Sequence, residues 1–271
     1  MYVRFWGVRG SIPVSNPGCV RSGGNTACVE VRCGQTAFIF DAGSGLRELG
    51  AALVEEGCAE VDLFLSHGHV DHVLGLPFFA FAFRAGNRLR LWSGGHAAGG
   101  GTERVVRSLM GSPLAPVGPD AFAADVTFRD FRPGRTLHPH PGIAIRTTPL
   151  RHPGGATGYR IDHAGRSVCY VTDTEHEPGT RDENVAGLID RADIVIYDAM
   201  FTDEELPHHR GWGHSTWQEG ARLCRAAGVG TYAIFHHAPG RDDDGLDAIE
   251  AAARRLFAGA VVAREGLTLS P

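Results

Sequence analysis

The sequence predicts an α/β protein in which two β-sheets pack face to face and helices cover both outer surfaces. Apolar runs typical of buried strands alternate along the chain with segments whose apolar residues recur at helical spacing. The 271 residues, 43% of them hydrophobic, can bury one large core, and no linker or change in composition divides them. Two β-rich halves, each with its own helices, favour this layered arrangement. We therefore expect one domain spanning residues 1–271.

The first half begins with short strand patterns separated by Gly-rich turns. The expected strands are 2–6, 27–32, 37–40, 61–65 and 88–92, and the expected helices are 46–56, 73–83 and 102–109. The Gly-rich stretch 94–101 reads as a flexible connection, because it lacks the strand–loop–helix spacing of a phosphate-binding fingerprint. The composition of segment 94–119 would also allow a lid.

The second half continues the same alternation. The expected strands are 126–128, 143–148, 159–162, 167–171, 194–197, 231–235 and one near 261, and the expected helices are 183–192, 216–227 and 245–257. A turn at 163–165 makes a plain hairpin of strands 159–162 and 167–171. Ser215 or Thr216 is a natural N-cap for the helix that follows.

Composition and charge narrow the classes of function. The net charge is −5, and this acidity argues against a protein that must grip a long nucleic acid. All basic residues are arginine, which we attribute to codon bias. The six cysteines are scattered without a C-x-x-C pair, as is typical of a reducing compartment. Neither a signal-peptide pattern nor an apolar run of membrane-spanning length is present. A cytoplasmic protein without membrane contact is expected.

The densest group of metal-binding residue types follows the apolar run at 61–65. It reads His67-Gly68-His69-Val70-Asp71-His72, and its imidazoles and carboxylate suit zinc, manganese or iron(II). His67 and His69 fall on one side of the extended chain at period two. Asp71 and His72 would open the next helix and point to a neighbouring position. One loop could therefore serve two metals. The alternative is a His-rich surface loop, which rarely has this spacing directly after a buried strand.

The H-x-H-x-D-H motif after a buried strand resembles the signature of the metallo-β-lactamase fold superfamily. The resemblance covers nearly the whole chain, from the first strand to Ala238. It implies a four-layer αβ/βα sandwich of two mixed β-sheets flanked by helices. It also implies a dinuclear site between the sheets for two divalent metal ions, zinc in the first instance, with Mn²⁺ or Fe²⁺ as alternatives.

The resemblance places further ligands at the ends of later strands. It implies His67, His69 and His152 as ligands of one metal, Asp71, His72 and His236 as ligands of the other, and Asp173 as the bridge. Alone, His152 could be a loop residue and Asp173 a turn former. Of the adjacent His236 and His237, the family's placement of the ligand directly after the strand favours His236. Asp41 matches a position that would orient a ligand or support the loop.

A second motif, Gly213-His214-Ser215-Thr216, precedes the helix 216–227. It resembles the Gly-His-Ser-Thr motif of the phosphodiesterase branch, which includes ribonuclease Z and small cyclic-phosphate phosphodiesterases. The resemblance implies that His214 lies over the scissile phosphate and assists the leaving group. Asp198 occupies the place of the acid in the His-Glu-Ala-Thr motif, where it would favour the imidazolium form. Alternatively, His214 is a loop residue and Asp198 satisfies local backbone groups.

These residues predict a dinuclear metal-dependent hydrolase. Its expected reaction is cleavage of a small or cyclic phosphodiester, such as a cyclic nucleotide, by a metal-bridging hydroxide. His214, Asp71 and Asp198 are the expected catalytic residues. Ribonuclease Z grips tRNA with a long arm between its third-motif histidine and its aspartate. Here only twenty residues separate His152 from Asp173, and they read as a hairpin, which disfavours tRNA processing.

Two other classes stay open at this stage. One is a metal-dependent hydrolase of a carboxylic ester, thioester or lactam, and the other is a non-enzymatic nucleotide-sensing module of the same fold. Arg9, Arg151 and Arg210 are candidate phosphate contacts, with an ordinary surface role as the alternative. His208 and His209 are expected on a mobile loop at the rim of the site. The resemblance also implies a homodimer as one option for assembly.

Overall fold

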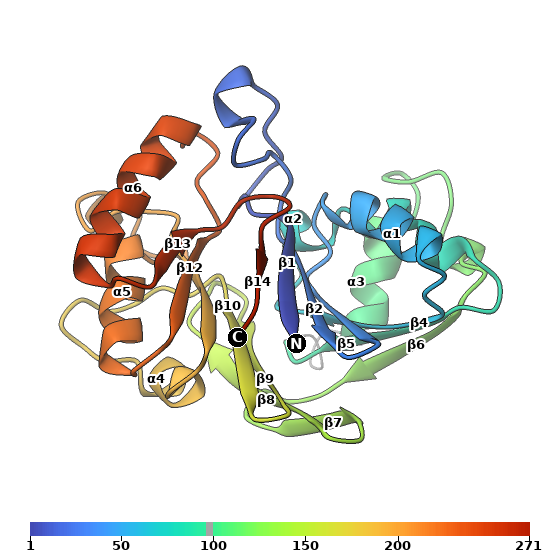
Figure 1. Cartoon of the computed structure of the whole chain (residues 1–271). Coiled ribbons are helices and arrows are strands. Elements are labelled where there is room, and N and C mark those ends of the chain that lie inside the picture. Colours follow the sequence, from blue (N-terminus) through green and yellow to red (C-terminus); the bar gives the residue numbers. More distant parts are fainter. Residues whose placement is uncertain (96–99) are drawn as a thin grey trace.

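The computed structural model describes residues 1–95 and 100–271, whose strands form two seven-stranded sheets (Figure 1). The first sheet has the order β14-β1-β2-β3-β4-β5-β6 and the second the order β13-β12-β11-β10-β9-β8-β7. The strands of the first sheet are β1 (Tyr2–Gly7), β2 (Cys28–Cys33), β3 (Thr36–Phe40), β4 (Glu60–Leu65), β5 (Arg88–Ser93), β6 (Asp125–Asp130) and β14 (Thr268–Leu269). Those of the second are β7 (Thr136–His140), β8 (Ile143–Leu150), β9 (Ala156–His163), β10 (Arg166–Val171), β11 (Ile194–Asp198), β12 (Thr231–Phe235) and β13 (Ala260–Val262).

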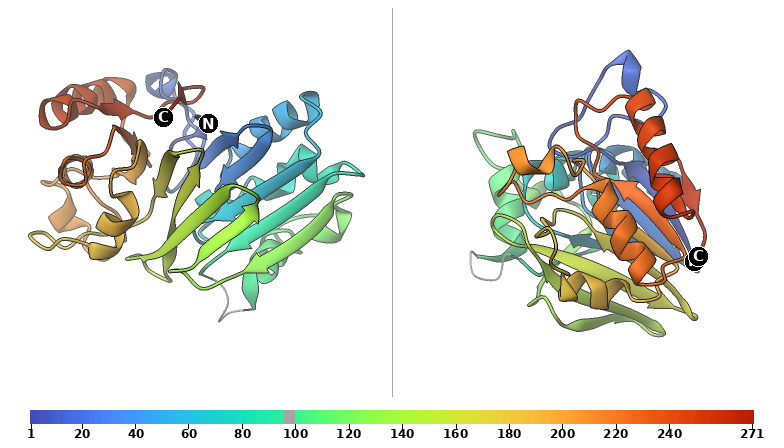
Figure 2. Two further views of the ribbon diagram at one scale, coloured as in Figure 1. Left: turned by 60° about the horizontal axis from the view of Figure 1, so that its bottom comes forward. Right: turned by 90° about the vertical axis from the view of Figure 1, so that its left-hand side faces the viewer.

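Helices cover the outer face of each sheet, as Figure 2 shows from two further sides. Helices α1 (Leu46–Glu55) and α3 (Gly101–Leu109) pack on the first sheet, and α4 (Glu183–Ile189), α5 (Trp217–Ala226) and α6 (Asp243–Leu256) pack on the second. A separate apolar cluster fills the space between the sheets. The predicted four-layer sandwich of two mixed sheets is therefore confirmed.

Strand β4 shows how the sequence produces these layers. Val61, Leu63 and Leu65 point to the helical layer, whereas Phe64 points to the core between the sheets. This alternation follows from the two-residue period of a strand, and burial of both faces explains the near-continuous apolar run. Asp62 lies on the inner face and is buried there with polar partners.

The predicted helix at 73–83 is wrong. The structure has a short α2 (Val70–Val73) followed by two 3₁₀ turns, η2 (Leu76–Phe78) and η3 (Ala80–Phe83). A Cβ atom at Gly75 would lie 2.2 Å from the Gly43 carbonyl oxygen, so this backbone packs too closely for a side chain. Pro77 lies within the first turn of η2 and has no N–H to donate to a longer helix.

Two short edge strands, β7 and β14, were not predicted, because one contains Pro139 and the other has only two residues. The other predicted elements are present, with bounds that differ by at most three residues. Within the segment 94–119, residues 101–109 form α3 in the outer layer, and residues 96–99 lie outside the described residues. Among the helices that the structure describes, none is long and apolar enough to cross a membrane.

The parallel strands bring the candidate residues together. Strands β3 to β6 are parallel in the first sheet, and β10 to β13 are parallel in the second. Carboxyl ends of neighbouring parallel strands lie at one edge of a sheet, where ligands commonly bind. The residues that follow or end five of these strands are Asp41 (β3), His67 (β4), Asp173 (β10), Asp198 (β11) and His236 (β12).

Candidate metal centre

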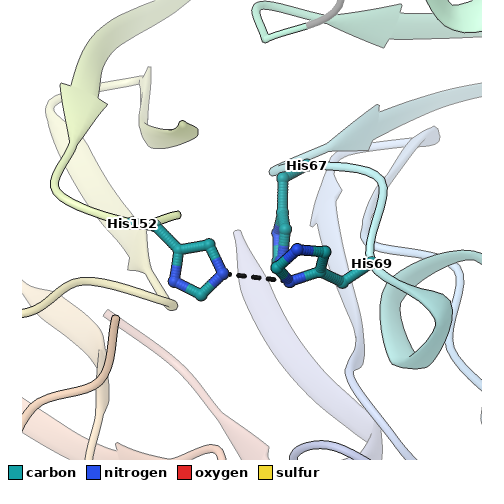
Figure 3. Close-up of side chains that lie close together, drawn as sticks. All are labelled: His67, His69 and His152. Carbon is teal, nitrogen blue, oxygen red and sulfur yellow. Dashed lines mark hydrogen bonds between the residues drawn. The ribbon is translucent and has the colours of Figure 1, made fainter. Parts of the chain in front are cut away.

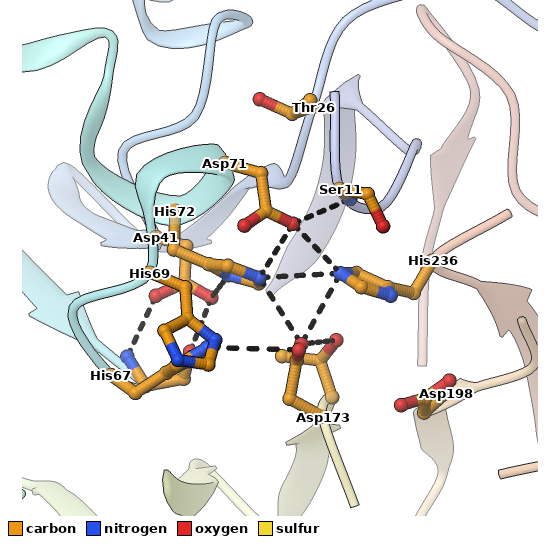
Figure 4. Close-up of polar contacts among 12 residues, drawn as sticks. Ser11, Thr26, Asp41, His67, His69, Asp71, His72, Asp173, Asp198 and His236 are labelled. Carbon is orange, nitrogen blue, oxygen red and sulfur yellow. Dashed lines mark hydrogen bonds and ion pairs between the residues drawn. The ribbon is translucent and has the colours of Figure 1, made fainter. Parts of the chain in front are cut away.

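Three residues of the centre adopt a backbone conformation that is unusual for their type. Asp41, Asp173 and His236 have φ angles of +61°, +57° and +62°. Each follows a strand closely and turns its side chain into the cluster (Figure 4). A non-glycine residue in the left-handed region costs about 1–3 kcal/mol, and such strain is concentrated at functional sites.

One group of potential ligands consists of His67, His69 and His152 (Figure 3). The Nε2 atom of His152 lies 3.0 Å from Nδ1 of His69. The His67 ring centroid is 4.4 Å from that of His69 and 4.6 Å from that of His152. Asp173 Oδ1 is 3.7 Å from Nε2 of both His67 and His152.

A second group consists of Asp71, His72 and His236 (Figure 4). The Nε2 atom of His72 lies 3.2 Å from Asp71 Oδ2 and 3.2 Å from His236 Nε2. Asp173 Oδ2 is 3.2 Å from Nε2 of both His72 and His236. The two oxygens of Asp173 therefore face the two groups, so this carboxylate could contact a cation held in either of them.

Hydrogen bonds on the far side of the rings orient three imidazoles. His72 Nδ1–H donates to Asp41 Oδ2 at 2.7 Å, and His152 Nδ1–H donates to the Gly213 carbonyl at 2.8 Å. The Ser66 hydroxyl donates its hydrogen bond to Asp41. Its oxygen can therefore only accept from His67, so His67 Nδ1–H donates to Ser66 Oγ at 3.0 Å. Each Nε2 lone pair is thereby directed to the cluster, as in protein sites that hold metals.

The donor set fits divalent cations. His67 Nε2 is buried and has no hydrogen-bond partner among the described residues. The Nε2 atoms of His72 and His236 lie 3.2 Å apart. If both rings were neutral with unprotonated Nε2 atoms, their lone pairs would repel each other, and a proton or a cation between them would relieve this repulsion. Burial lowers the pKa of His72, but the carboxylates of Asp173, Asp41 and Asp71 raise it well above its usual value. These carboxylates make the surroundings of His72 strongly negative, and a bound cation would compensate this charge.

His214 lies beside this cluster and is paired with Asp198. Its Nδ1 is 3.0 Å from Asp198 Oδ2 and 3.8 Å from Asp173 Oδ1, and its ring centroid is 5.1 Å from that of His236. Burial lowers the pKa of His214, but the charge of Asp198 and its hydrogen bond outweigh burial and raise this pKa to about 9. The imidazolium form is therefore favoured at neutral pH.

Asp41 was expected to orient a ligand or support the loop, and it contacts both a proposed ligand, His72, and the start of the loop, Ser66. It accepts hydrogen bonds from the Ser66 backbone N–H and hydroxyl, from His72, and from the hydroxyl of Tyr170 at 2.7 Å. Tyr170 belongs to the second sheet, so this carboxylate also joins the two sheets at the centre.

Further residues support the centre, and of these Glu175 was missed by the sequence reasoning. The Ser11 backbone N–H donates to Asp71 Oδ2 at 2.7 Å, and a Cβ atom at Gly10 would collide with the His236 ring. The Glu175 carboxylate accepts from the backbone N–H groups of Gly211 and Gly213, 2.8 Å and 2.9 Å away. The only sequence signal for Glu175 was its position two residues after Asp173.

A second contact that the sequence reasoning missed joins His176 to Ser215. His176 is buried, and its Nδ1 lies 2.8 Å from the Ser215 hydroxyl, which in turn lies 3.0 Å from the Tyr197 hydroxyl. Thr216, one of the two residues expected to cap α5, accepts from the Glu219 backbone N–H.

Three other expectations need correction or closer definition. Arg9 is fully buried and donates to the Gly23 and Arg241 carbonyls, so the idea that it contacts a phosphate is wrong. His237 turns away from the cluster: its Nε2–H donates to the Ala263 carbonyl, and burial lowers its pKa to about 3. Arg151 pairs with Glu177 at 2.8 Å beside the centre.

The rim loop carries His208, His209 and Arg210. His208 and Arg210 are exposed, whereas the His209 ring stacks on Phe201 and donates to the Glu205 carbonyl. His209 is thus held in place by its neighbours.

The chain matches a known protein family. Residues 36–237 match the family described as beta-lactamase superfamily domain, and the chain belongs to this family. The predicted resemblance is confirmed, and the family's fold implies divalent metal ions at this centre.

Individual relatives extend over most of the chain. Ribonuclease Z of Halobacterium salinarum is 25% identical over 98% of this chain and 96% of its own length. Among solved structures, YhfI from Bacillus subtilis superposes with a TM-score of 0.75 at 20% identity and covers 99% of both chains. A diphosphatase of the PhnP family superposes with a TM-score of 0.71 at 21% identity, over 100% of this chain and 97% of that one.

Proposed function

We propose that the protein is a metal-dependent hydrolase that cleaves a small phosphodiester. The observation that carries the proposal is the pairing of His214 with Asp198 directly beside Asp173, the carboxylate that faces both ligand groups. A phosphodiester needs a positive environment for its phosphoryl oxygens and a proton for its departing oxygen. The names of the relatives, a ribonuclease and a diphosphatase, agree with chemistry at phosphorus.

The metal ligands proposed here are His67, His69 and His152 for one cation, Asp71, His72 and His236 for the other, and Asp173 for both. The set is imidazole-rich with carboxylates, which favours zinc, with Mn²⁺ or Fe²⁺ as alternatives. When bound, two such cations supply Lewis acidity toward the phosphoryl oxygens and a nucleophile at neutral pH.

His214 supplies the proton. Since its Nδ1–H donates to Asp198, the proton available for transfer is the one on Nε2. Asp198 itself is held by the backbone N–H groups of Thr174 and Met200, which keeps the His214 ring in one orientation. Proton donation by a side chain held in place in this way contributes typically about 10²–10⁴-fold to the rate.

A small substrate is favoured over a folded RNA. All residues from His152 to Asp173 are described, and they form β9, β10 and a short turn at Ala164 and Gly165, with no protruding arm. The net charge of −5 offers little attraction for a polyanion.

The test is hydrolysis of aryl phosphodiesters by zinc- and manganese-loaded protein. Asp173→Ala should lose both metal and activity, whereas His214→Ala should retain metal. Because His214 serves the leaving group, His214→Ala should lose about 10²–10⁴-fold in kcat with a phenol leaving group and much less with p-nitrophenol. His208→Ala, an exposed histidine on the same loop, is the matched control and should behave as the wild type.

An equal loss by His214→Ala for both leaving groups would argue against proton donation. Metal binding without hydrolysis of any diester would overturn the phosphodiesterase proposal and direct attention to esters, thioesters and lactams. Hydrolysis of a structured RNA at a higher kcat/KM than any small diester would overturn the small-substrate proposal.

A further inference from the structure

A mainly apolar cavity of about 370 Å³, whose wall also contains Arg104 and Ser108, lies against the H-x-H-x-D-H segment. Its walls include Gly68, Val70 and Val73 from the H-x-H-x-D-H segment, and Val105, Leu109 and Leu114 from α3 and the segment after it. Gly68 lies between His67 and His69, and Val70 lies between His69 and Asp71. The loop that carries four of the proposed ligands therefore forms part of the cavity wall.

Two of the aliphatic side chains in this wall are exposed. Val70 is 59% exposed and Leu114 is 73% exposed, although an apolar side chain gains by leaving water. The volume lies at the small end of the range for pockets that bind small molecules, which are mostly apolar. An aryl or similarly sized group would fill it and cover both side chains.

We propose that this cavity binds the ester group that stays on phosphorus, and that the substrate is a diester in which that group is apolar. The inference rests on the proposed function. His214, the proton donor, lies beside His152, Asp173 and His236 and is not part of the cavity wall, so the leaving group belongs on its side. The retained group, attached to the same phosphorus, then extends past Gly68 and Val70 into the cavity.

The experiment compares two diesters with the same p-nitrophenol leaving group, one retaining phenyl and the other retaining methyl. Because the leaving group is unchanged, the ratio of their kcat/KM values reports binding of the retained group. We expect the phenyl diester to be favoured roughly tenfold or more in the wild type. Leu114→Ala, which shortens the wall, and Ser108→Trp, which fills the cavity, should each reduce this ratio several-fold. Both positions are exposed, so the fold should tolerate the changes.

Val117→Ala is the matched control, since Val117 is an exposed aliphatic residue near Leu114 that does not line the cavity. It should leave the ratio unchanged. Binding provides a second readout: phenyl phosphate should bind the metal-loaded wild type more tightly than methyl phosphate, and Ser108→Trp should abolish the difference.

A ratio near one, or a ratio that neither cavity variant changes, would overturn the inference while leaving the phosphodiesterase proposal intact. If no diester is hydrolysed, the proposed function fails, and the comparison of the two monoesters still decides whether the cavity binds an apolar group beside the metals. Equal affinity for phenyl and methyl phosphate would then refute it.

Discussion

The histidines of the metal centre depend on residues that do not themselves face the metals. Asp41, Ser66 and the Gly213 carbonyl each accept a hydrogen bond from a ring N–H and so direct the opposite nitrogen inward. The H-x-H-x-D-H motif could be recognised in the sequence because His67, His69, Asp71 and His72 lie within six consecutive residues. Asp41 was expected to orient a ligand, but the contact from Gly213 was not readable, since Gly213 is 61 residues from His152.

Glu175 provides a test of such support. Its carboxylate binds the backbone of Gly211 and Gly213, and this loop presents both the Gly213 carbonyl to His152 and the His214 side chain. We expect Glu175→Ala to lower kcat about 10–100-fold, the range typical of outer partners of metal ligands. Glu175→Gln keeps an acceptor oxygen and should retain most of the activity.

The matched control is Glu177→Ala, which removes a nearby exposed carboxylate that pairs only with Arg151 among the contacts described. Steady-state kinetics and metal content of all three variants are the measurements. A wild-type kcat for Glu175→Ala, or an equal loss for Glu177→Ala, would refute the role assigned to Glu175.

Among the secondary-structure elements, those with strong periodicity matched the prediction and those shaped by close backbone packing did not. The helix predicted at 73–83 is the clearest case. Its apolar residues have helical spacing, but Gly75 packs closely against the backbone of Gly43, and Pro77 has no N–H to donate to a longer helix. Strand β4 had the opposite outcome: its apolar run was correctly read as a strand, but the role of Asp62 within it was not foreseen.

Asp62 joins β4 to strands of both sheets. It forms a bidentate pair with Arg90 of β5 at 2.7 Å, accepts from Trp92 Nε1, and lies 2.7 Å from Nε2 of His140 on β7. We expect Asp62→Asn to lower the free energy of unfolding by about 1–3 kcal/mol, because it removes the buried carboxylate from Arg90 and leaves this guanidinium with the more exposed Glu60 as its charge partner. Urea denaturation of the variant measures this loss.

The same carboxylate makes stability depend on pH. Burial raises the pKa of Asp62, but its hydrogen bonds to Arg90, His140 and Trp92 outweigh burial and lower this pKa below its usual value. Its contribution is therefore present above the pKa of the unfolded chain and is lost as the pH falls through the folded-state pKa. Asp62→Asn should lack this part of the acid-induced loss of stability.

Asp125→Asn, which changes an exposed aspartate on β6, two strands away in the same sheet, is the control for both measurements. It should match the wild type in urea and in acid. An Asp62→Asn protein as stable as the wild type would show that the buried cluster contributes no net stability.

In the molecule as a whole, the proposed ligands of the centre come from both sheets. His67, His69, Asp71 and His72 follow β4 of the first sheet, whereas His152, Asp173 and His236 follow β8, β10 and β12 of the second. Bound metal would therefore connect the two halves of the sandwich and stabilise the folded state over the unfolded chain.

Removal of metal should accordingly lower thermal stability. At a free metal concentration about 1,000-fold above Kd, binding contributes about 4 kcal/mol, which for a chain of this size corresponds to a fall in Tm on the order of 10 °C after chelation. Calorimetry before chelation, after it, and after zinc is restored is the measurement. The chelator should not change the Tm of Asp173→Ala, and an unchanged wild-type Tm would contradict metal binding at this centre.

The amino-acid sequence alone was sufficient to predict the sandwich and the family, because these depend on local periodicity and on the short spacing of the H-x-H-x-D-H motif. Only the tertiary structure decided that Arg9 is buried and that Ser66 and the Gly213 carbonyl help to orient the histidines. It also revealed the cavity beside Gly68. These features arise where distant segments meet, and contacts between segments far apart in the chain leave no pattern in the local order of residues.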